Sequence, residues 1–157
     1  MAYIGLGSNL GEPTTQINKA IDSIKLIDDT QLISQSSLYL SEPMGDQNQE
    51  NYINAVVKLK TSLSPLILLD QLQQIENNQG RVRNSERWSA RTLDLDLLLY
   101  GNQTIKNDRL IVPHYGMKSR NFVIIPLAEI EPQLNLPDGS EITSLKKSLG
   151  NQGIKKL

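Results

Sequence analysis

RTLDLDLLLYG, residues 91–101, places two aspartates two positions apart in a run that otherwise has the composition of a buried strand. Side chains alternate between the two faces of a strand, so residues two apart share a face. Strict alternation predicts Leu93, Leu95, Leu97 and Leu99 on one face, and Asp94, Asp96, Leu98 and Tyr100 on the other. At about 3.3 Å per residue, the two aspartate Cα atoms would lie roughly 6.5–7 Å apart. Two carboxylates this close indicate arginine partners, a protected sheet edge or a site for divalent cations.

Three further segments predict strands by composition or alternation. They are residues 2–6, residues 31–40 and residues 52–61, YINAVVKLKT. In the last of these, Ile53, Ala55, Val57 and Leu59 face one way, and Tyr52, Asn54, Val56 and Lys58 face the other. A short segment ending at Ile105 is expected to pair back onto the strand at residues 94–100.

Helical spacing of apolar residues predicts two amphipathic helices and one shorter helix. The first follows Pro13, and the second begins at Pro65 with Ser64 as its N-cap and ends before Gly80. The third spans residues 122–130, and the tail from residue 136 onward has no definite assignment. The order βαββαβ favours an α+β fold, namely a ferredoxin-like two-layer sandwich with a mainly antiparallel sheet, helices packed on it and C-terminal additions.

Composition limits the class of protein. With 157 residues, the chain is expected to form a single domain over residues 1–157. It has no apolar stretch near the roughly 20 residues of a membrane span and no signal-peptide pattern, so we expect a cytoplasmic protein that does not enter a membrane. The net charge of −1 argues against nonspecific nucleic-acid binding. The absence of cysteine and the single histidine exclude zinc–thiolate and multi-histidine metal sites.

Two loops carry further signals. GLGSNLG, residues 5–11, lacks the G-x-G-x-x-G spacing of a dinucleotide-binding loop, so its glycines indicate turns. RVRNSERWSAR, residues 81–91, feeds four arginines directly into the aspartate pair. Guanidinium groups bind phosphate oxygens, and carboxylates hold the metal that neutralises the remaining charge. Together they indicate a magnesium–nucleotide site.

Several separated motifs in the same order resemble the 6-hydroxymethyl-7,8-dihydropterin pyrophosphokinase family of folate biosynthesis. They are YIGLGSNLG, EPMG, NYINAVV, IENNQGRVR, ERWSARTLDLDLLLYG, RLIVPHYGMKSRNF and PLAEIEP. The resemblance covers nearly the whole chain. It implies the ferredoxin-like fold and the transfer of pyrophosphate from ATP to the hydroxymethyl oxygen of the pterin, with release of AMP.

The resemblance also implies roles for individual residues. Arg81, Arg91, Asp94 and Asp96 match catalytic positions, and the two aspartates match ligands of two Mg²⁺ ions. Gln73, Arg83, Trp88, Arg109, His114, Tyr115 and Arg120 match ATP contacts. Ser41, Met44, Tyr52, Asn54 and Phe122 match the pterin site. No residue is identified as a general base, and His114 is assigned to ATP binding without proton transfer.

Four positions depart from the family pattern. They are Asn84, Ser89, Ile111 and Gly116, the last of which stands where an acidic residue is common. None of them is a metal ligand. Two other readings compete with the pyrophosphokinase, namely a single-stranded RNA-binding module and a two-metal phosphohydrolase. ATP and the pterin are the expected partners of a monomer.

Overall fold

The computed structural model describes residues 1–42, 51–79 and 93–157. The strands are β1 (Ala2–Ser8), β2 (Thr30–Gln35), β3 (Tyr39–Ser41), β4 (Tyr52–Thr61), β5 (Asp94–Tyr100), β6 (Ile105–Lys106), β7 (Ile111–Val112) and β8 (Ile154–Lys156). The helices are α1 (Pro13–Lys25), α2 (Pro65–Asn78), the short 3₁₀ helix at Met117–Ser119, α3 (Asn121–Ile130) and α4 (Ile142–Leu149).

Six strands form one sheet in the order β5-β1-β4-β3-β8, and β2 also pairs with β4. All of the neighbouring strands are antiparallel. The first strand of the chain therefore lies between β4 and β5, which is the arrangement of a ferredoxin-like βαββαβ unit. The predicted fold class is confirmed.

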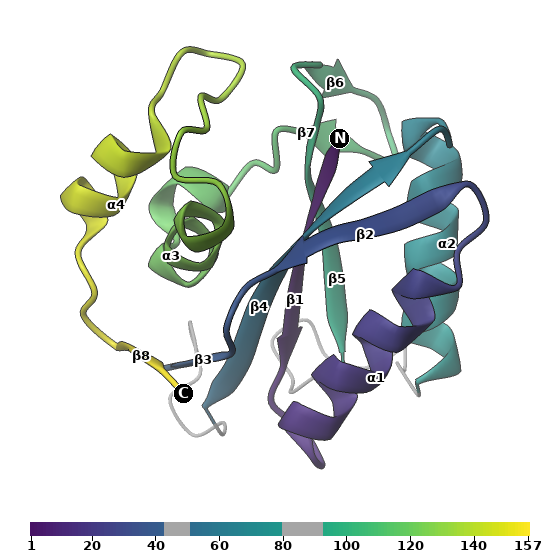
Figure 1. Ribbon diagram of the computed structural model, residues 1–157, viewed down its shortest axis with the longest axis horizontal. Coiled ribbons are helices and arrows are strands. Elements are labelled where there is room, and N and C mark those ends of the chain that lie inside the picture. Colours follow the sequence, from purple (N-terminus) through teal and green to yellow (C-terminus); the bar gives the residue numbers. More distant parts are fainter. Residues whose placement is uncertain (43–50, 80–92) are drawn as a thin grey trace.

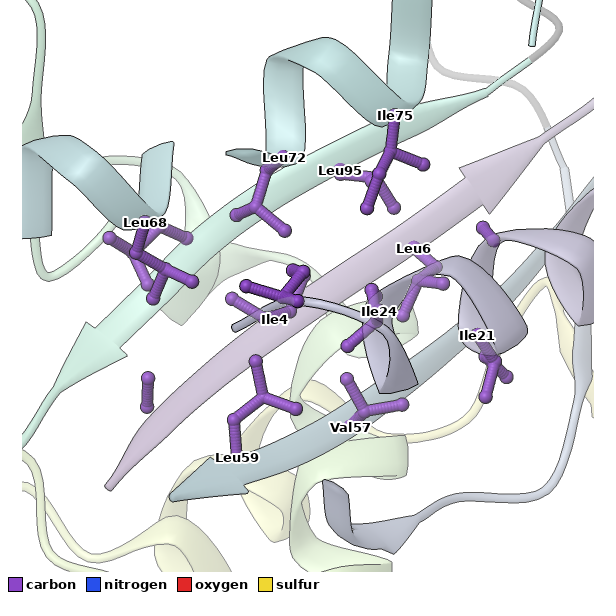
Figure 2. Close-up of a cluster of buried hydrophobic side chains, with 14 of the residues drawn as sticks. Ile4, Leu6, Ile21, Ile24, Val57, Leu59, Leu68, Leu72, Ile75 and Leu95 are labelled. Carbon is purple, nitrogen blue, oxygen red and sulfur yellow. The ribbon is translucent and has the colours of Figure 1, made fainter. Parts of the chain in front are cut away.

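α1 and α2 cover one face of the sheet (Figure 1). Their apolar stripes meet alternate residues of β1, β4 and β5 in one buried cluster, which Figure 2 shows in close-up. The predicted start of α2 is correct, because the Ser64 hydroxyl accepts a hydrogen bond from the Ile67 backbone N–H at 3.4 Å. This bond satisfies one of the donors that every helix leaves free in its first turn.

α3 and α4 lie on the opposite face, so the predicted C-terminal additions form a third layer (Figure 1). α3 is joined to the sheet by polar contacts as well as by apolar packing. Glu131 accepts a hydrogen bond from the Tyr3 hydroxyl at 3.1 Å and pairs with Lys58 Nζ at 2.9 Å. Glu129 accepts hydrogen bonds from the Ser37 backbone N–H and hydroxyl and from the Tyr39 hydroxyl.

Strict alternation in β5 holds through Leu98 and is wrong from Leu99 onward. The pairing with β1 matches Ile4 to Leu97 and Tyr3 to Leu99, which leaves Leu98 as an extra residue in a β-bulge. Leu98 and Leu99 both enter the core beneath α3, whereas Tyr100 packs against the core beneath α1 and α2. The Tyr100 hydroxyl donates a hydrogen bond to the Leu63 carbonyl oxygen there.

The predicted strand at residues 31–40 is divided into β2 and β3. At the break, the Ser36 N–H donates to the Val56 carbonyl, and the Ser36 hydroxyl takes the place of a backbone acceptor for the Val56 N–H, at 2.9 Å in each case. The segment at Ile105 pairs with β7, which corrects the expectation that it would pair with β5. Among the described residues, no helix is long and apolar enough to cross a membrane.

Candidate active site

The sheet brings the predicted pterin-binding and metal-binding residues into two adjacent rows. Asn54, Gly7 and Asp94 are directly opposed across β4, β1 and β5, and Val56, Gly5 and Asp96 form the next row. Directly opposed residues project from the same face of a sheet. Both aspartates therefore stand on the face that carries α3, and the middle strand contributes glycines between them and β4.

Gly7 contributes no side chain of its own to the strip between Asn54 and Asp94. A Cβ atom at residue 7 would lie 3.4 Å from Asn54 Oδ1 and 3.8 Å from the Tyr52 ring. The amide oxygen of Asn54 is thus directed over the backbone of β1. A flat molecule lying on this strip would reach toward Asn54 at one end and Asp94 at the other.

The geometry of Asp94 and Asp96 fits a magnesium site shared with a ligand. Both residues are partly exposed, and 47% of the Asp96 side chain remains accessible. Among the residues that the structure describes, no group of three or more His, Cys, Asp or Glu side chains surrounds a common point. Mg²⁺ is commonly bound by one or two carboxylates, with water and substrate phosphates completing its coordination.

Glu76 fixes the backbone between the two aspartates. Its side chain comes from α2, is only 4% exposed, and accepts a hydrogen bond from the Leu95 N–H at 2.8 Å. β5 is at the edge of the sheet, so this N–H points away from β1. The sequence places Glu76 beside the apolar stripe of this helix, within possible reach of a neighbouring pocket, but it does not predict the hydrogen bond to Leu95.

His114 lies beside Asp96, with its Nε2 atom 4.0 Å from Asp96 Oδ2. Its Nδ1 atom accepts a hydrogen bond from the Gly116 N–H at 3.2 Å, so the neutral ring carries its proton on Nε2. Burial, together with the nearby charge of Arg120, lowers the pKa of His114 to about 4. The ring is therefore neutral at pH 7 and presents an N–H donor to the site.

A cavity of about 300 Å³ runs along the edge of β5 and contains most of the described residues predicted to bind ATP. Gln73, Arg109, His114 and Tyr115 line it together with Glu76 and Asp96. The Arg109 guanidinium pairs with Asp70 and donates to Gln73 Oε1 at 3.4 Å. Tyr115 is 79% exposed, and its ring stacks on the His114 ring with 4.7 Å between centroids.

The described residues predicted to bind the pterin also lie close together. Asn54 Nδ2 donates a hydrogen bond to the Ser41 hydroxyl at 2.6 Å, and both residues are buried. Tyr52 is directly opposed to Ser41 and shares its face. Phe122 and Ser41 line a second cavity, of about 260 Å³, together with Arg120.

Arg120 connects the two groups of residues. Its guanidinium carbon lies 5.8 Å from the centroid of the Tyr115 ring and 5.8 Å from that of the Phe122 ring. The predicted roles of Arg81, Arg83, Trp88, Arg91 and Met44 concern positions outside the described residues.

Comparisons with known proteins agree with these observations. Residues 3–132 match the family model for 7,8-dihydro-6-hydroxymethylpterin-pyrophosphokinase. A 2-amino-4-hydroxy-6-hydroxymethyldihydropteridine pyrophosphokinase of Haemophilus influenzae is 53% identical over 156 residues, which are 99% of this chain and 97% of that protein. Its counterpart in Pseudomonas aeruginosa is 48% identical over 155 residues, which are 99% of this chain and 95% of that protein.

Among solved structures, the chain is similar in fold to a crystal structure described as HPPK-DHPS in complex with substrates. The TM-score is 0.78 at 14% identity, and the match covers 99% of this chain and 47% of that chain. A Plasmodium falciparum HPPK-DHPS structure gives the same TM-score and identity, with 99% and 48% coverage. The chain thus spans about half the length of these solved chains. On the family match and the two full-length relatives, the chain belongs to the 7,8-dihydro-6-hydroxymethylpterin-pyrophosphokinase family.

Proposed function

We propose that the protein transfers the pyrophosphoryl group of ATP to the hydroxymethyl oxygen of 6-hydroxymethyl-7,8-dihydropterin in folate biosynthesis. Membership of the pyrophosphokinase family supports this reaction. The observation that assigns this reaction to particular residues is the row formed by Asn54, Gly7 and Asp94. This row puts an amide suited to a heterocycle and a carboxylate suited to a metal on either side of a glycine.

Asp94 and Asp96 would hold two Mg²⁺ ions beside the phosphates of ATP. When bound, these ions would neutralise phosphate charge and orient the reacting oxygens. The partial exposure of both carboxylates supports this role, because ligands shared with a substrate must be reachable from the cavity. Glu76 contributes indirectly, by holding the Leu95 backbone so that the aspartates on either side keep their direction.

The ATP phosphates would lie along the cavity at the edge of β5. Arg109 is available to them, because its pair with Asp70 is half-exposed and such surface pairs contribute little to stability. His114 would donate its Nε2 proton to an oxygen of the nucleotide in a hydrogen bond and would not transfer it. Tyr115 and Arg120 would complete this side of the site.

The pterin would lie on the other side, over Gly7. Asn54 Nδ2 donates a hydrogen bond to the Ser41 hydroxyl, and the amide oxygen of Asn54 would accept a hydrogen bond from the heterocycle. Tyr52 and Phe122 supply aromatic surface for a flat ring. With this placement, the hydroxymethyl group would point toward the aspartates.

In the proposed reaction, the hydroxymethyl oxygen bonds to the β-phosphorus and loses its proton. The bond from the β-phosphorus to the oxygen that bridges it to the α-phosphorus breaks, and AMP leaves with that oxygen. Arg81 and Arg91 would stabilise the charge on the transferred group.

The test is a product assay with purified protein, Mg²⁺, ATP and the pterin alcohol, with AMP separated from ADP. Equal amounts of AMP and pterin diphosphate are expected. ADP with pterin monophosphate would keep the site but change the reaction. ATP loss independent of the pterin would favour the phosphohydrolase, and salt-sensitive binding of oligonucleotides without turnover would favour the RNA-binding module. The cytoplasmic location and the monomeric state stay predictions.

A further inference from the structure

We infer that residues 150–153, the turn between α4 and β8, position the two parts of the pterin site, and that Asn121 fastens this turn to the start of α3. The inference rests on the function proposed above, which gives neither the turn nor Asn121 a role. It is carried by hydrogen bonds that join the turn to β3 on one side and to α3 on the other.

The α4–β8 turn forms part of the wall of the second cavity. This cavity, of about 260 Å³, is lined by Ser41 from β3, by Phe122 from α3, and by Gln152 and Gly153 from the turn. Ser41 and Phe122 are both predicted to bind the pterin, and they come from elements far apart in the sequence. The turn therefore lies where it can set the spacing between them.

On one side, the turn is joined to β3. β8 pairs with β3 and places Ile154 opposite Ser41 (Figure 1). The Glu42 N–H then donates to the Gly153 carbonyl oxygen at 3.1 Å, which extends this pairing into the turn. Ser41 in turn accepts the hydrogen bond from Asn54. The turn thus holds the end of β3 that contacts Asn54.

On the other side, Asn121 joins the turn to α3. Its Nδ2 atom donates to the Gln152 carbonyl oxygen at 2.9 Å and to the Gly150 carbonyl oxygen at 3.4 Å. Asn121 is the first residue of α3 and lies between Arg120 and Phe122 in the chain. Its side chain therefore fixes the turn relative to Phe122.

Together these bonds connect β3 to α3 across the cavity. A site whose two parts are held at a fixed spacing loses less conformational freedom when its ligand binds. The residues that line the cavity at the edge of β5 belong to other elements, among them α2 and β5. Loosening the turn should consequently weaken pterin binding and leave nucleotide binding unchanged.

Asn121→Ala removes the tether without adding a charge. We expect the Kd of the pterin alcohol to rise about threefold to tenfold, the range that corresponds to the net contribution of one hydrogen bond. Binding is measured with Mg²⁺ and α,β-methylene-ATP, in which carbon replaces the bridging oxygen, so that transfer cannot occur. Asn102→Ala, in the exposed turn after β5, is the control and should bind the pterin as the wild-type protein does. An unchanged pterin Kd in Asn121→Ala would overturn the inference, and so would an equal loss of nucleotide affinity.

A pair of glycine variants separates positioning from stability. Gly153 has a φ of +76° and Gly139, in the turn before α4, has a φ of +90°, so alanine is strained at both positions. Both variants should lower the melting temperature, but only Gly153→Ala should weaken pterin binding. Equal pterin affinities in the two variants would overturn the inference.

A double-mutant cycle tests whether Asn121 acts through the turn or by contacting the pterin itself. If it acts through the turn, Asn121→Ala should weaken pterin binding little further in a Gly153→Ala background. Losses that multiply in the double variant would overturn the inference. Absence of pterin-dependent AMP formation by the wild-type protein would instead count against the proposed function.

Discussion

Asp94 and Asp96 keep a common face because the bulge of β5 comes after them. The register with β1 is regular from Gly7 opposite Asp94 to Ile4 opposite Leu97, and the shift follows at Leu98. An extra residue placed before Asp96 would have turned one carboxylate into the core beneath α1 and α2. Because the bulge lies at Leu98, after both aspartates, the two carboxylates stay on one face of the sheet.

The two aspartates are expected to be essential for turnover and dispensable for folding. Asp94→Asn or Asp96→Asn removes a charged metal ligand, which is worth several kcal/mol of transition-state stabilisation, so kcat/KM should fall at least about a hundredfold. AMP formation at saturating Mg²⁺ measures the loss. Asp22→Asn, at an exposed position on α1, is the control and should have no effect on AMP formation. Full activity in either aspartate variant would exclude the metal assignment.

Glu129 should make the stability of the protein depend on pH in the acid range. Burial would raise the pKa of its carboxyl, but hydrogen bonds from Ser37 and Tyr39, with the charge of Lys156, outweigh burial and lower it. A carboxyl whose pKa is lower in the folded than in the unfolded protein stabilises the fold above its ordinary pKa. That stabilisation is lost as the pH falls through the folded-state pKa.

Glu129→Gln should therefore reduce the free energy of unfolding at pH 7 and flatten its decline below about pH 5, near the ordinary pKa range of a carboxyl. Urea unfolding at a series of pH values measures both effects. If the curves for the variant and the wild-type protein run parallel down to pH 3, Glu129 is not a source of the pH dependence.

At the scale of elements, α2 and β5 are joined by one hydrogen bond that serves both stability and the site. The Glu76 carboxylate reaches the Leu95 N–H at the edge of the sheet. An edge strand has a row of backbone groups without partners in the sheet, and a side chain from a packed helix is one way to satisfy them. The same bond holds the segment that carries Asp94 and Asp96.

Glu76→Ala should leave the Leu95 N–H buried without this acceptor, which costs about 1–3 kcal/mol in the free energy of unfolding. Glu76→Gln retains a carbonyl oxygen at the same place and should recover most of that loss. Urea unfolding compares the two variants. Equal stabilities of the alanine and glutamine variants would mean that this hydrogen bond does not contribute to the free energy of unfolding.

On the scale of the whole molecule, the sheet has an apolar core on each face. The core beneath α1 and α2 includes Leu72, which is fully buried, whereas Leu26 at the end of α1 is 82% exposed. Leu72→Ala should lower the free energy of unfolding by about 2–5 kcal/mol, because the packed surroundings do not fill the cavity. Leu26→Ala changes the same atoms at the surface and should stay within about 0.5 kcal/mol of the wild-type value. A similar loss in both variants would contradict the observed packing.

Most of the fold could be predicted from periodicity. β4 has the predicted bounds at residues 52–61, and its two sets of alternating residues face the two cores as expected. α2 begins at Pro65 after the Ser64 cap, and α3 begins one residue before the predicted start. These elements are predictable because propensity, capping and burial all favour the same structure in one local stretch of chain.

The candidate site was predictable in its residues and not in its geometry. The motifs identify Asp94, Asp96, Asn54 and His114, but no local pattern indicates that Gly7 lies between Asn54 and Asp94. The position of Glu76 beside the core of α2 was predictable, but its hydrogen bond was not, because the donor, the Leu95 N–H, is 19 positions away along the chain. The bonds from Asn121 to the α4–β8 turn likewise join segments that are distant in the sequence.

The sequence by itself therefore determined the class of fold, the order of the elements in its βαββαβ core and the family to which the chain belongs, since these are recorded in local periodicity and in motifs. Only the tertiary structure decided the bulge at Leu98, the break at Ser36 and the third layer formed by α3 and α4. The physical reason is that strand register and side-chain satisfaction depend on partners from distant segments. Those pairings stabilise the protein only once the strands of the sheet have come together.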